Sequence, residues 1–194
     1  MKRVGKIKRV TKETDIEMEL IIDGSGILEG KTGIPFLDHM LELWAHHSRC
    51  DLKMKVNGDL AVDGHHTAED VGICLGQCFK NALGDKSGIN RYGHSVVPMD
   101  ETLVMVALDL SGRPYLSYEV SFVASRVGSF DVELVEEFLR AFCNNSGTTL
   151  HIKMLAGKNT HHIIEAIFKS FARAVREAAA VVGNCIPSTK GLME

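Results

Sequence analysis

The sequence has no apolar run long enough to cross a membrane, no excess of basic charge and no Cys-x-x-Cys pair. A bilayer-spanning helix needs about 20 consecutive apolar residues, and residues 1–6 lead into no signal-peptide core. The 22 basic and 25 acidic residues give a formal charge of −3, so no surface for nucleic acid or anionic lipid is indicated. We therefore expect a cytoplasmic protein with neither a membrane nor a nucleic acid as partner.

The cysteines are odd in number and show no metal-binding spacing; they are Cys50, Cys74, Cys78, Cys143 and Cys185. Cys74 and Cys78 lie four residues apart in an apolar helical segment, which is typical of small core residues in a reducing compartment. A thiolate metal site is the less favoured alternative. Low-complexity and linker stretches are also missing. With 194 residues, 45% of them hydrophobic and 24% charged, the chain is suited to one large globular domain or two small ones.

What the sequence does contain is a repeated His-His-x-x-Glu motif, at residues 65–69 and again at 161–165. Each copy opens a segment whose apolar residues recur at helical spacing. On a helix the first His and the Glu share one face, whereas the second His is turned by about 100°. These ligands suit a borderline divalent metal such as Mn, Fe, Co or Zn better than Ca or Mg. A single His-His pair is more often a solvated helix start, so the repetition carries the inference and favours two ions.

The elements predicted around the two motifs recur in the same order. The first half reads as strands at 4–10 and 14–22, a helix at 35–48, a strand at 51–56 and a helix at 65–83. The second half reads as strands at 91–98 and 101–110, an extended segment at 115–122, a helix at 133–142, a strand at 149–155 and a helix at 161–182.

Matching residues at fixed offsets support a duplication: Glu13-Thr14 recurs as Glu101-Thr102, 88 residues later, and Leu41 recurs as Leu139, 98 residues later. We predict an α+β protein made of two similar halves, 1–88 and 89–194, in one compact domain. Each half is a small mixed sheet with two helices on one face, and a polar C-terminal tail follows the second.

The repeat adds two candidate ligands, because His39 coincides with Glu137 at the offset of 98. The full candidate set is His39, His65, His66, Glu69, Glu137, His161, His162 and Glu165. By pseudo-symmetry one metal takes His65 and Glu69 with His162 and a member of the His39/Glu137 pair. The other metal takes His161 and Glu165 with His66 and the remaining member. The sequence leaves open whether the halves meet within one chain or across a subunit interface.

Basic side chains lie at strand ends and near the predicted metal helices: Arg91, Arg113, Lys169 and, in the tail, Lys190 next to Ser188. Arginine forks, lysine charges and a serine hydroxyl suit a phosphate group. Each alone is more commonly solvated surface, and their grouping in one pocket does not follow from sequence.

Carboxylates at the starts of equivalent strands form a further candidate group, with Glu13 in the first half and Asp100 and Glu101 in the second. A carboxylate near a divalent cation can act as acid or base, according to the field of the metal and its burial. An exposed strand end is the alternative interpretation of Asp100 and Glu101.

Six motifs together resemble the imidazoleglycerol-phosphate dehydratase family, in that family's order and over nearly the whole chain. They are Gly33-Ile-Pro-Phe-Leu-Asp-His-Met40, His65-His-Thr-Ala-Glu-Asp70, Pro98-Met-Asp-Glu101, Asp109-Leu-Ser-Gly-Arg-Pro114, His161-His-x-x-Glu165 and Pro187-Ser-Thr-Lys-Gly191. Glu137 departs from the pattern, since several members have His there, and this bears on metal preference or affinity.

The resemblance implies a lyase that dehydrates imidazole glycerol phosphate to imidazole acetol phosphate in histidine biosynthesis. It implies two Mn²⁺ per active site, which hold the substrate ring as an imidazolate that serves as an electron sink while hydroxide leaves. It implies halves like domain 2 of ribosomal protein S5, and trimers that form a 24-subunit shell with metal sites completed between subunits. Proton-handling roles then fall on Glu165, Glu13 and Asp100, and substrate contacts on Arg91, Arg113, Lys169, Ser188 and Lys190.

Two other functions fit the repeated ligands. A two-metal hydrolase would release inorganic phosphate, whereas the dehydratase keeps the phosphate on its product. A non-catalytic metal-storage shell would tolerate replacement of Arg91 or Lys190.

Overall fold

The computed structural model describes residues 2–191 and 193. These residues form two four-stranded mixed sheets, each with one parallel pair at its edge. Sheet one has the order β1-β2-β4-β3, with β1 (Val4–Val10), β2 (Thr14–Ile21), β4 (Asp51–Gly58) and β3 (Leu28–Glu29). Sheet two has the order β5-β6-β10-β7, with β5 (Tyr92–Met99), β6 (Thr102–Asp109), β10 (Thr149–Ala156) and β7 (Tyr115–Glu119). A short ribbon of β8 (Arg126–Val127) and β9 (Phe130–Asp131) follows β7.

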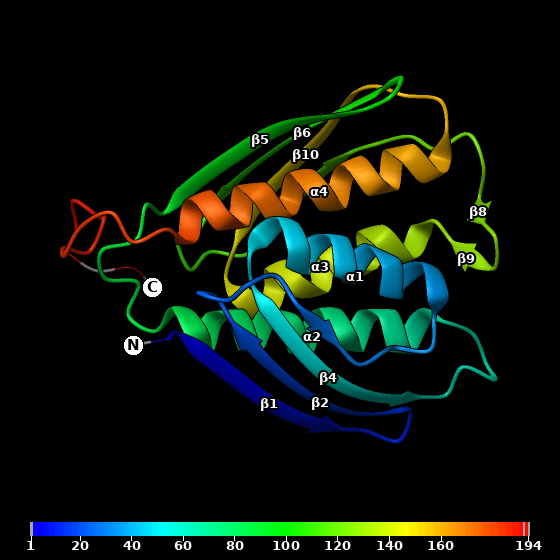
Figure 1. Cartoon of the computed structure of the whole chain (residues 1–194), viewed down its shortest axis with the longest axis horizontal. Coiled ribbons are helices and arrows are strands. Elements are labelled where there is room, and N and C mark those ends of the chain that lie inside the picture. Colours follow the sequence, from blue (N-terminus) through cyan, green and yellow to red (C-terminus); the bar gives the residue numbers. More distant parts are fainter. Residues whose placement is uncertain (1, 192, 194) are drawn as a thin grey trace.

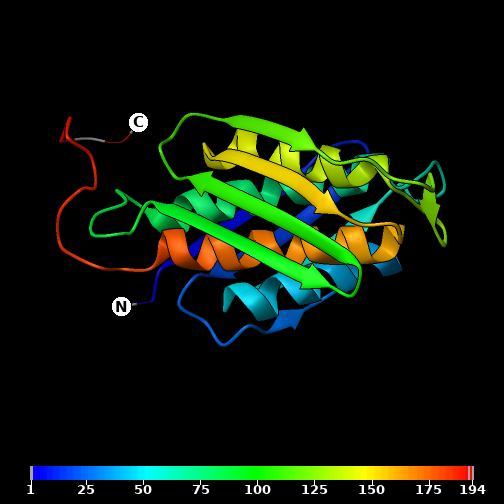
Figure 2. The ribbon, with the colours of Figure 1, turned by 90° about the horizontal axis from the view of Figure 1, so that it is seen from above.

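The helices lie between the two sheets in a four-layer arrangement (Figure 1). They are α1 (Pro35–Ser48), α2 (His65–Leu83), α3 (Glu133–Ser146) and α4 (Thr160–Ala179). Helices α1 and α2 cover the inner face of sheet one, and α3 and α4 cover that of sheet two, behind which they lie in Figure 2. The prediction of an α+β protein with two helices on one face of each sheet is therefore confirmed. No helix in the described part of the chain is both long and apolar enough to span a bilayer.

The sheets follow from strict alternation in the sequence. In β2, Ile16 and Leu20 are fully buried while Glu17 and Glu19 point outward, which is the period of a half-buried strand. The helices bury the stripe that faces the opposite half, where Trp44 packs against Phe171 with ring centroids 6.2 Å apart. Fully burying a side chain of this kind contributes about 1.5–3 kcal/mol. One continuous apolar core therefore joins the two halves.

Each helix packs against a helix of the other half, and this gives two parallel pairs, α1 with α4 and α2 with α3. Glycine makes the second contact close, because a Cβ at Gly72 would lie 2.5 Å from the carbonyl oxygen of Phe138 and one at Gly76 would lie 2.6 Å from that of Phe142. The equal spacing of these contacts shows that α2 and α3 run in the same direction. Each ligand-bearing helix thus lies beside the first helix of the other half.

Most predicted boundaries hold to within one or two residues, but three differ for physical reasons. The last helix ends at Ala179, so its predicted continuation to Val182 is wrong: Val181 forms an isolated bridge with Ile89. The extended segment predicted to Phe122 ends at Glu119, where its pairing with β10 stops. Helix α3 runs four residues beyond its predicted end and stops at Gly147, whose φ of 68° is left-handed. The division at residue 88 stays a prediction.

Candidate functional site

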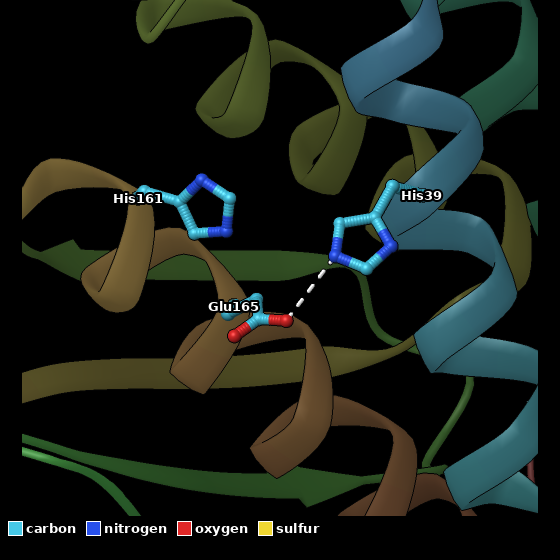
Figure 3. Close-up of side chains that lie close together, drawn as sticks. All are labelled: His39, His161 and Glu165. Carbon is cyan, nitrogen blue, oxygen red and sulfur yellow. Dashed lines mark hydrogen bonds and ion pairs between the residues drawn. The ribbon is translucent and has the colours of Figure 1, made fainter.

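Three of the predicted ligands converge where α1 meets α4 (Figure 3). His161 and Glu165 are one turn apart on α4, and His39 reaches toward them from α1. The Nε2 of His39 lies 3.2 Å from Oε1 of Glu165, and one ligand atom from each residue lies within 4.8 Å of the other two. Glu165 is only 6% exposed. The convergence shows that one chain brings the first helix of one half to the ligand helix of the other, a point that the sequence left open.

Local structure fixes both helices at this point. Pro35 occupies the first turn of α1, where its missing N–H is not needed. The side chain of Asn159 caps α4 by accepting hydrogen bonds from the backbone N–H groups of His161 and His162. The ring of His161 also meets that of Phe36 edge-on, with centroids 5.2 Å apart. The ligands therefore project from ordered helix starts.

A lysine completes the surroundings of Glu165. The Nζ of Lys169, one turn along α4, lies 3.4 Å from Oε2 of Glu165 and 3.5 Å from the sulfur of Met99. The two carboxylate oxygens thus face different partners, an imidazole and an ammonium group. A buried carboxylate in this setting is suited both to metal ligation and to proton exchange.

The donor set fits a borderline divalent metal. Two imidazoles and one carboxylate are ligands that Mn, Fe, Co and Zn accept. Two atoms that each bind one such ion at about 2.2 Å lie at most about 4.4 Å apart, and the observed limit of 4.8 Å comes close to that. Small rotamer changes in the half-exposed His39 side chain are enough to close the difference.

The first half offers the counterpart of this cluster, more loosely. His65 and Glu69 lie on α2, and Glu137 lies on the neighbouring α3, each of them half-buried. Within the described chain, however, these residues do not form a second group of ligand atoms within the same limit. The pairing of Glu137 with His65 and Glu69 stays a prediction.

The second His of each motif points away from the first, as helical geometry predicts. The two rings are 6.2 Å apart and nearly perpendicular in both copies, at 89° for His65 and His66 and at 90° for His161 and His162. Neither His66 nor His162 belongs to the three-residue cluster. Each motif therefore directs its two imidazoles in two directions.

Carboxylates flank both nitrogens of these two rings. In the first half, Nδ1 of His66 lies 2.9 Å from Asp59 and Nε2 lies 3.7 Å from Glu13. In the second half, Nδ1 of His162 lies 2.8 Å from Glu101 and Nε2 lies 3.9 Å from Asp100. Both predicted proton-handling carboxylates other than Glu165 thus lie on the Nε2 side of a motif histidine.

The hydrogen bonds shift the titration of these groups. The bond to Asp59 raises the pKa of His66 above its ordinary 6.5, and the bond to Glu101 raises the pKa of His162 in the same way. The bond from His162, joined by backbone N–H groups of Asn159 and Lys158, holds the pKa of Glu101 far below its usual range. Glu101 therefore acts as an ionised acceptor.

Four of the five predicted substrate residues share one hollow of about 440 Å³ beside the C-terminal tail; they are Arg91, Arg113, Ser188 and Lys190. The fork of Arg91 donates to both oxygens of Asp109, and its Nη1 donates to the carbonyl of Pro187. Of the five N–H groups of the Arg91 guanidinium, the two others have no acceptor among the described residues and could bind a ligand. The side chain of Arg113 is 65% exposed. The hollow is therefore cationic and suited to an anion such as phosphate.

The fifth residue, Lys169, lies elsewhere, and so does the three-residue cluster. The backbone N–H of Arg91 donates to the carbonyl of Ala178, near the end of α4, whereas Glu165 lies near its start. At about 1.5 Å per residue, these positions are roughly 20 Å apart along the helix. The hollow and the cluster therefore lie near opposite ends of α4, the helix that the C-terminal tail follows in Figure 1.

Sequence reasoning missed Asp59 and gave Glu101 no role of its own. Asp59 lies in the loop after β4, seven residues before His66, and carries no periodicity or motif. The neighbouring Gly58 is the local sequence feature that relates to this contact, because a Cβ there would lie 2.1 Å from Oγ1 of Thr67. The glycine lets the end of β4 approach the first turn of α2 closely.

Comparison with known proteins matches these features to one family. Residues 32–175 match the family model for imidazoleglycerol-phosphate dehydratase. The enzyme of that name from Moorella thermoacetica is 55% identical over the full length of both chains, and that from Pelotomaculum thermopropionicum is 55% identical over 97% of each.

Two crystal structures of the enzyme have the same fold. The one from Staphylococcus aureus superposes with a TM-score of 0.83 at 41% identity, covering 93% of this chain and 99% of the other. The one from Pyrococcus furiosus, in complex with (S)-C348, superposes with a TM-score of 0.85 at 37% identity, covering 96% and 100%. This chain therefore belongs to the imidazoleglycerol-phosphate dehydratase family of hydro-lyases.

Proposed function

We propose that this chain dehydrates imidazole glycerol phosphate to imidazole acetol phosphate in histidine biosynthesis, with two Mn²⁺ per active site. The observation that carries the proposal is the convergence of His39, His161 and Glu165 on one point. The set His65, His66, Glu69, Glu137 and His162 supplies the remaining ligands. The family assignment supports the reaction, and the donor chemistry supports the metal.

The reaction removes a proton from one carbon of the substrate and hydroxide from its neighbour. Because that carbon has no adjacent carbonyl, its proton is barely acidic and an electron sink is needed. Two bound divalent ions would supply it through Lewis acidity, by holding the substrate ring as an imidazolate. Glu165 is suited to move the proton, since its buried carboxylate lies between an imidazole and the ammonium group of Lys169.

Glu13 and Asp100 are the further proton-handling groups in this proposal. Each lies within 4 Å of the Nε2 atom of a motif histidine, His66 or His162. Asp100 takes a left-handed φ of 50° at the turn between β5 and β6, which turns its side chain outward at 76% exposure. In its protonated form, a carboxyl group held there can donate a proton to the departing hydroxide, which leaves as water.

The cationic hollow is proposed to bind the phosphate. Lys190 and Arg113 supply charge, and Ser188 supplies a hydroxyl donor. Arg91 donates to the carbonyl of Pro187 in the tail, and two of its N–H groups have no acceptor among residues 2–191 and 193. Lys169, one turn from Glu165 in the middle of α4, is proposed to contact the substrate near Glu165. The phosphate stays on the product, because nothing in the mechanism attacks phosphorus.

The separation of hollow and cluster supports self-association. A phosphorylated imidazole is much shorter than the roughly 20 Å between them along α4. One substrate molecule therefore spans both only if the hollow of one subunit meets the cluster of another. This supports trimers that assemble into a 24-subunit shell, with active sites completed between subunits.

The outer faces of the two sheets differ in a way that also supports self-association. Sheet one exposes a ladder of alternating charges, in which Lys6 pairs with Glu19 and Lys8 with Glu17. Sheet two carries the exposed pair Lys153–Glu119 together with apolar side chains on β5, β7 and β10: Tyr92, Val96, Tyr115 and Leu155 are each about half exposed, at 49–57%. Apolar side chains exposed in this way can be covered in an assembly.

A cytoplasmic location is proposed from the thiols. All five cysteines are free, and Cys50, Cys74, Cys78 and Cys143 are buried. Burial raises the pKa of Cys50, Cys78 and Cys143 to about 12. Unpaired thiols are typical of proteins in a reducing compartment.

The test is turnover of imidazole glycerol phosphate by the protein before and after a chelator strips its metal. We expect imidazole acetol phosphate to form, activity to vanish without metal and return with Mn²⁺, and the particle to shrink on stripping, as measured by light scattering. Release of inorganic phosphate would support the hydrolase instead. Metal uptake with no turnover, unaffected by Arg91→Ala or Lys190→Ala, would support a storage shell.

A further inference from the structure

The carboxylates at Nδ1 of His66 and His162 have a role beyond their ion pairs. We propose that Asp59 and Glu101 are positioning residues of the two-metal site, each of which makes Nδ1 the protonated nitrogen of its histidine and leaves Nε2 free as the ligand atom. The inference rests on the proposed function, since it assigns these side chains to the metal ligands of that site.

Asp59 is held in place by its surroundings. Its backbone N–H donates to the carbonyl of Glu13, and its own carbonyl accepts from Val62. One carboxylate oxygen, Oδ2, meets Nδ1 of His66 at 2.9 Å. The other, Oδ1, is buried and has no hydrogen-bond partner in the described residues. His66 is therefore the group that compensates this carboxylate, which makes their contact energetically important to both.

Glu101 is anchored more fully. Its Oε1 accepts from the backbone N–H groups of Lys158 and Asn159, which lead into α4. Its Oε2 accepts from Nδ1 of His162 at 2.8 Å. The turn between β5 and β6 is thus tied both to the start of the ligand helix and to the ring of its second histidine.

A carboxylate oxygen within hydrogen-bond distance of Nδ1 determines the histidine tautomer. A carboxylate only accepts hydrogen bonds, so the nitrogen that faces it must carry the hydrogen. In a neutral imidazole the other nitrogen then keeps its lone pair and is the one that can bind a metal. Both rings consequently direct Nε2 toward the side where Glu13 and Asp100 lie.

The two halves reach this arrangement with residues that are not equivalent in the repeat. The repeat pairs Glu101 with Glu13, yet in the first half Asp59 takes the Nδ1 contact and Glu13 lies at Nε2. A carboxylate at Nδ1 is therefore not a leftover of the duplication. Its presence in both halves, from a loop in one and a hairpin in the other, points to a requirement of the site.

The test measures Mn²⁺ binding without turnover, from the electron paramagnetic resonance signal of free Mn²⁺ during titration of metal-free protein. In Asp59→Asn and Glu101→Gln the amide can donate to Nδ1 and permit the wrong tautomer. We expect each variant to bind one class of Mn²⁺ about 10–100-fold more weakly, measured at a temperature at which circular dichroism shows the metal-free variant to be folded. Glu119→Gln, which removes an exposed ion pair with Lys153, is the matched control and should bind as the wild type does.

The outcomes separate this inference from the proposed function. Wild-type protein that binds no Mn²⁺ would defeat the proposed metal dependence itself. Wild-type protein that binds two ions, with both variants equal to it, would overturn the positioning role alone. Should Asp59→Asn fail to fold, Glu101→Gln decides by itself, and Glu101→Asp is expected to recover part of the lost affinity because it keeps the charge.

Discussion

The two halves surround the same glutamate position with different side chains. Glu165, in the second half, is flanked by Lys169 one turn later and by the imidazole of His39. Glu69, in the first half, has Ile73 at the position of the lysine and Glu137 at that of the imidazole. The duplication has kept the ligand spacing and changed the electrostatics. Of the two glutamates, only Glu165 has the surroundings of a proton carrier.

The halves also differ one residue beyond each glutamate. Asp70, 5% exposed, accepts hydrogen bonds from Arg9 and Thr14 and so ties α2 to β1 and β2. The corresponding Ala166 is fully buried, and Val97 stands in the place of Arg9. The first half is therefore held together partly by a buried ion pair, whereas the second relies on apolar packing.

The largest expected effect separates the two glutamates. Glu165→Gln should lower kcat by about 10²–10⁴-fold at saturating Mn²⁺, because general acid-base catalysis contributes that much. Glu69→Gln should mainly weaken Mn²⁺ binding and recover most of its kcat as metal is added. Steady-state rates across a Mn²⁺ series would show this, with particle size as the check on assembly. Equal losses of kcat in both variants at saturating metal would mean that the halves have not diverged in chemistry.

The next effect concerns stability. Asp70→Ala leaves Arg9 and Thr14 without their acceptor and should lower the free energy of unfolding by about 2–4 kcal/mol, somewhat less than for a fully buried pair because Arg9 is partly exposed. The reciprocal substitution Ala166→Asp should lower the free energy of unfolding by a similar amount, because Val97 stands where Arg9 would pair with the new carboxylate. Urea unfolding of the metal-free protein measures both. An Asp70→Ala midpoint equal to that of Asp15→Ala, an exposed change on β2, would contradict the role of the pair.

The sequence alone predicts the long elements of the fold but not the short ones. The long strands and helices follow from periods of 2 and 3.6, as in Ile16, Met18 and Leu20 of β2. The two-residue strands β3, β8 and β9 could not be predicted, because two residues have no period. The end of α4 was misplaced because Ala180 and Val182 suit a helix locally, while pairing with residues 88–89 draws them out of it.

For the site, the repeat was enough to name His39, His161 and Glu165 as candidate ligands, but it left open which of the two motif helices His39 faces. The sequence could not show that the guanidinium group of Arg91 donates two of its hydrogen bonds to Asp109. Nor could it show that the hollow lies near the end of α4, far from Glu165. These facts depend on which helix ends meet in space. The contact of Asp59 with His66 could not be predicted for the same reason, because it joins a loop to a helix start.

A third effect tests the lysine that distinguishes the second half. Lys169→Ile gives α4 the side chain found in α2 and removes a charge-assisted hydrogen bond worth about 1.5–3 kcal/mol. We expect kcat/KM to fall roughly 10–100-fold, with metal affinity little changed. Lys153→Ile, which breaks an exposed pair with Glu119, is the control. Wild-type kinetics in Lys169→Ile would show that the lysine only neutralises a buried charge.

The smallest effect concerns an arginine that occurs at equivalent positions in the two halves. Arg3 donates hydrogen bonds to both carboxylate oxygens of Asp23 and, through Nη1, to the carbonyl of Ala179. Arg91 donates in the same way to Asp109 and to the carbonyl of Pro187. Hydrogen bonds from Arg3 lower the pKa of Asp23 below 3.8. Because the folded-state pKa is the lower one, the stabilisation is complete above about pH 4 and disappears as the pH falls through that pKa.

Asp23→Asn should therefore unfold more easily than the wild type at pH 7, by no more than about 1 kcal/mol because the side chain is 44% exposed and screened by solvent. The difference should shrink toward zero as the pH falls below 3.8. Urea midpoints of both proteins between pH 7 and pH 3 measure this, with Asp15→Asn as a control that loses no ion pair in the described chain. A gap that stays constant with pH would mean that the Arg3–Asp23 contact stabilises the fold independently of the charge on Asp23.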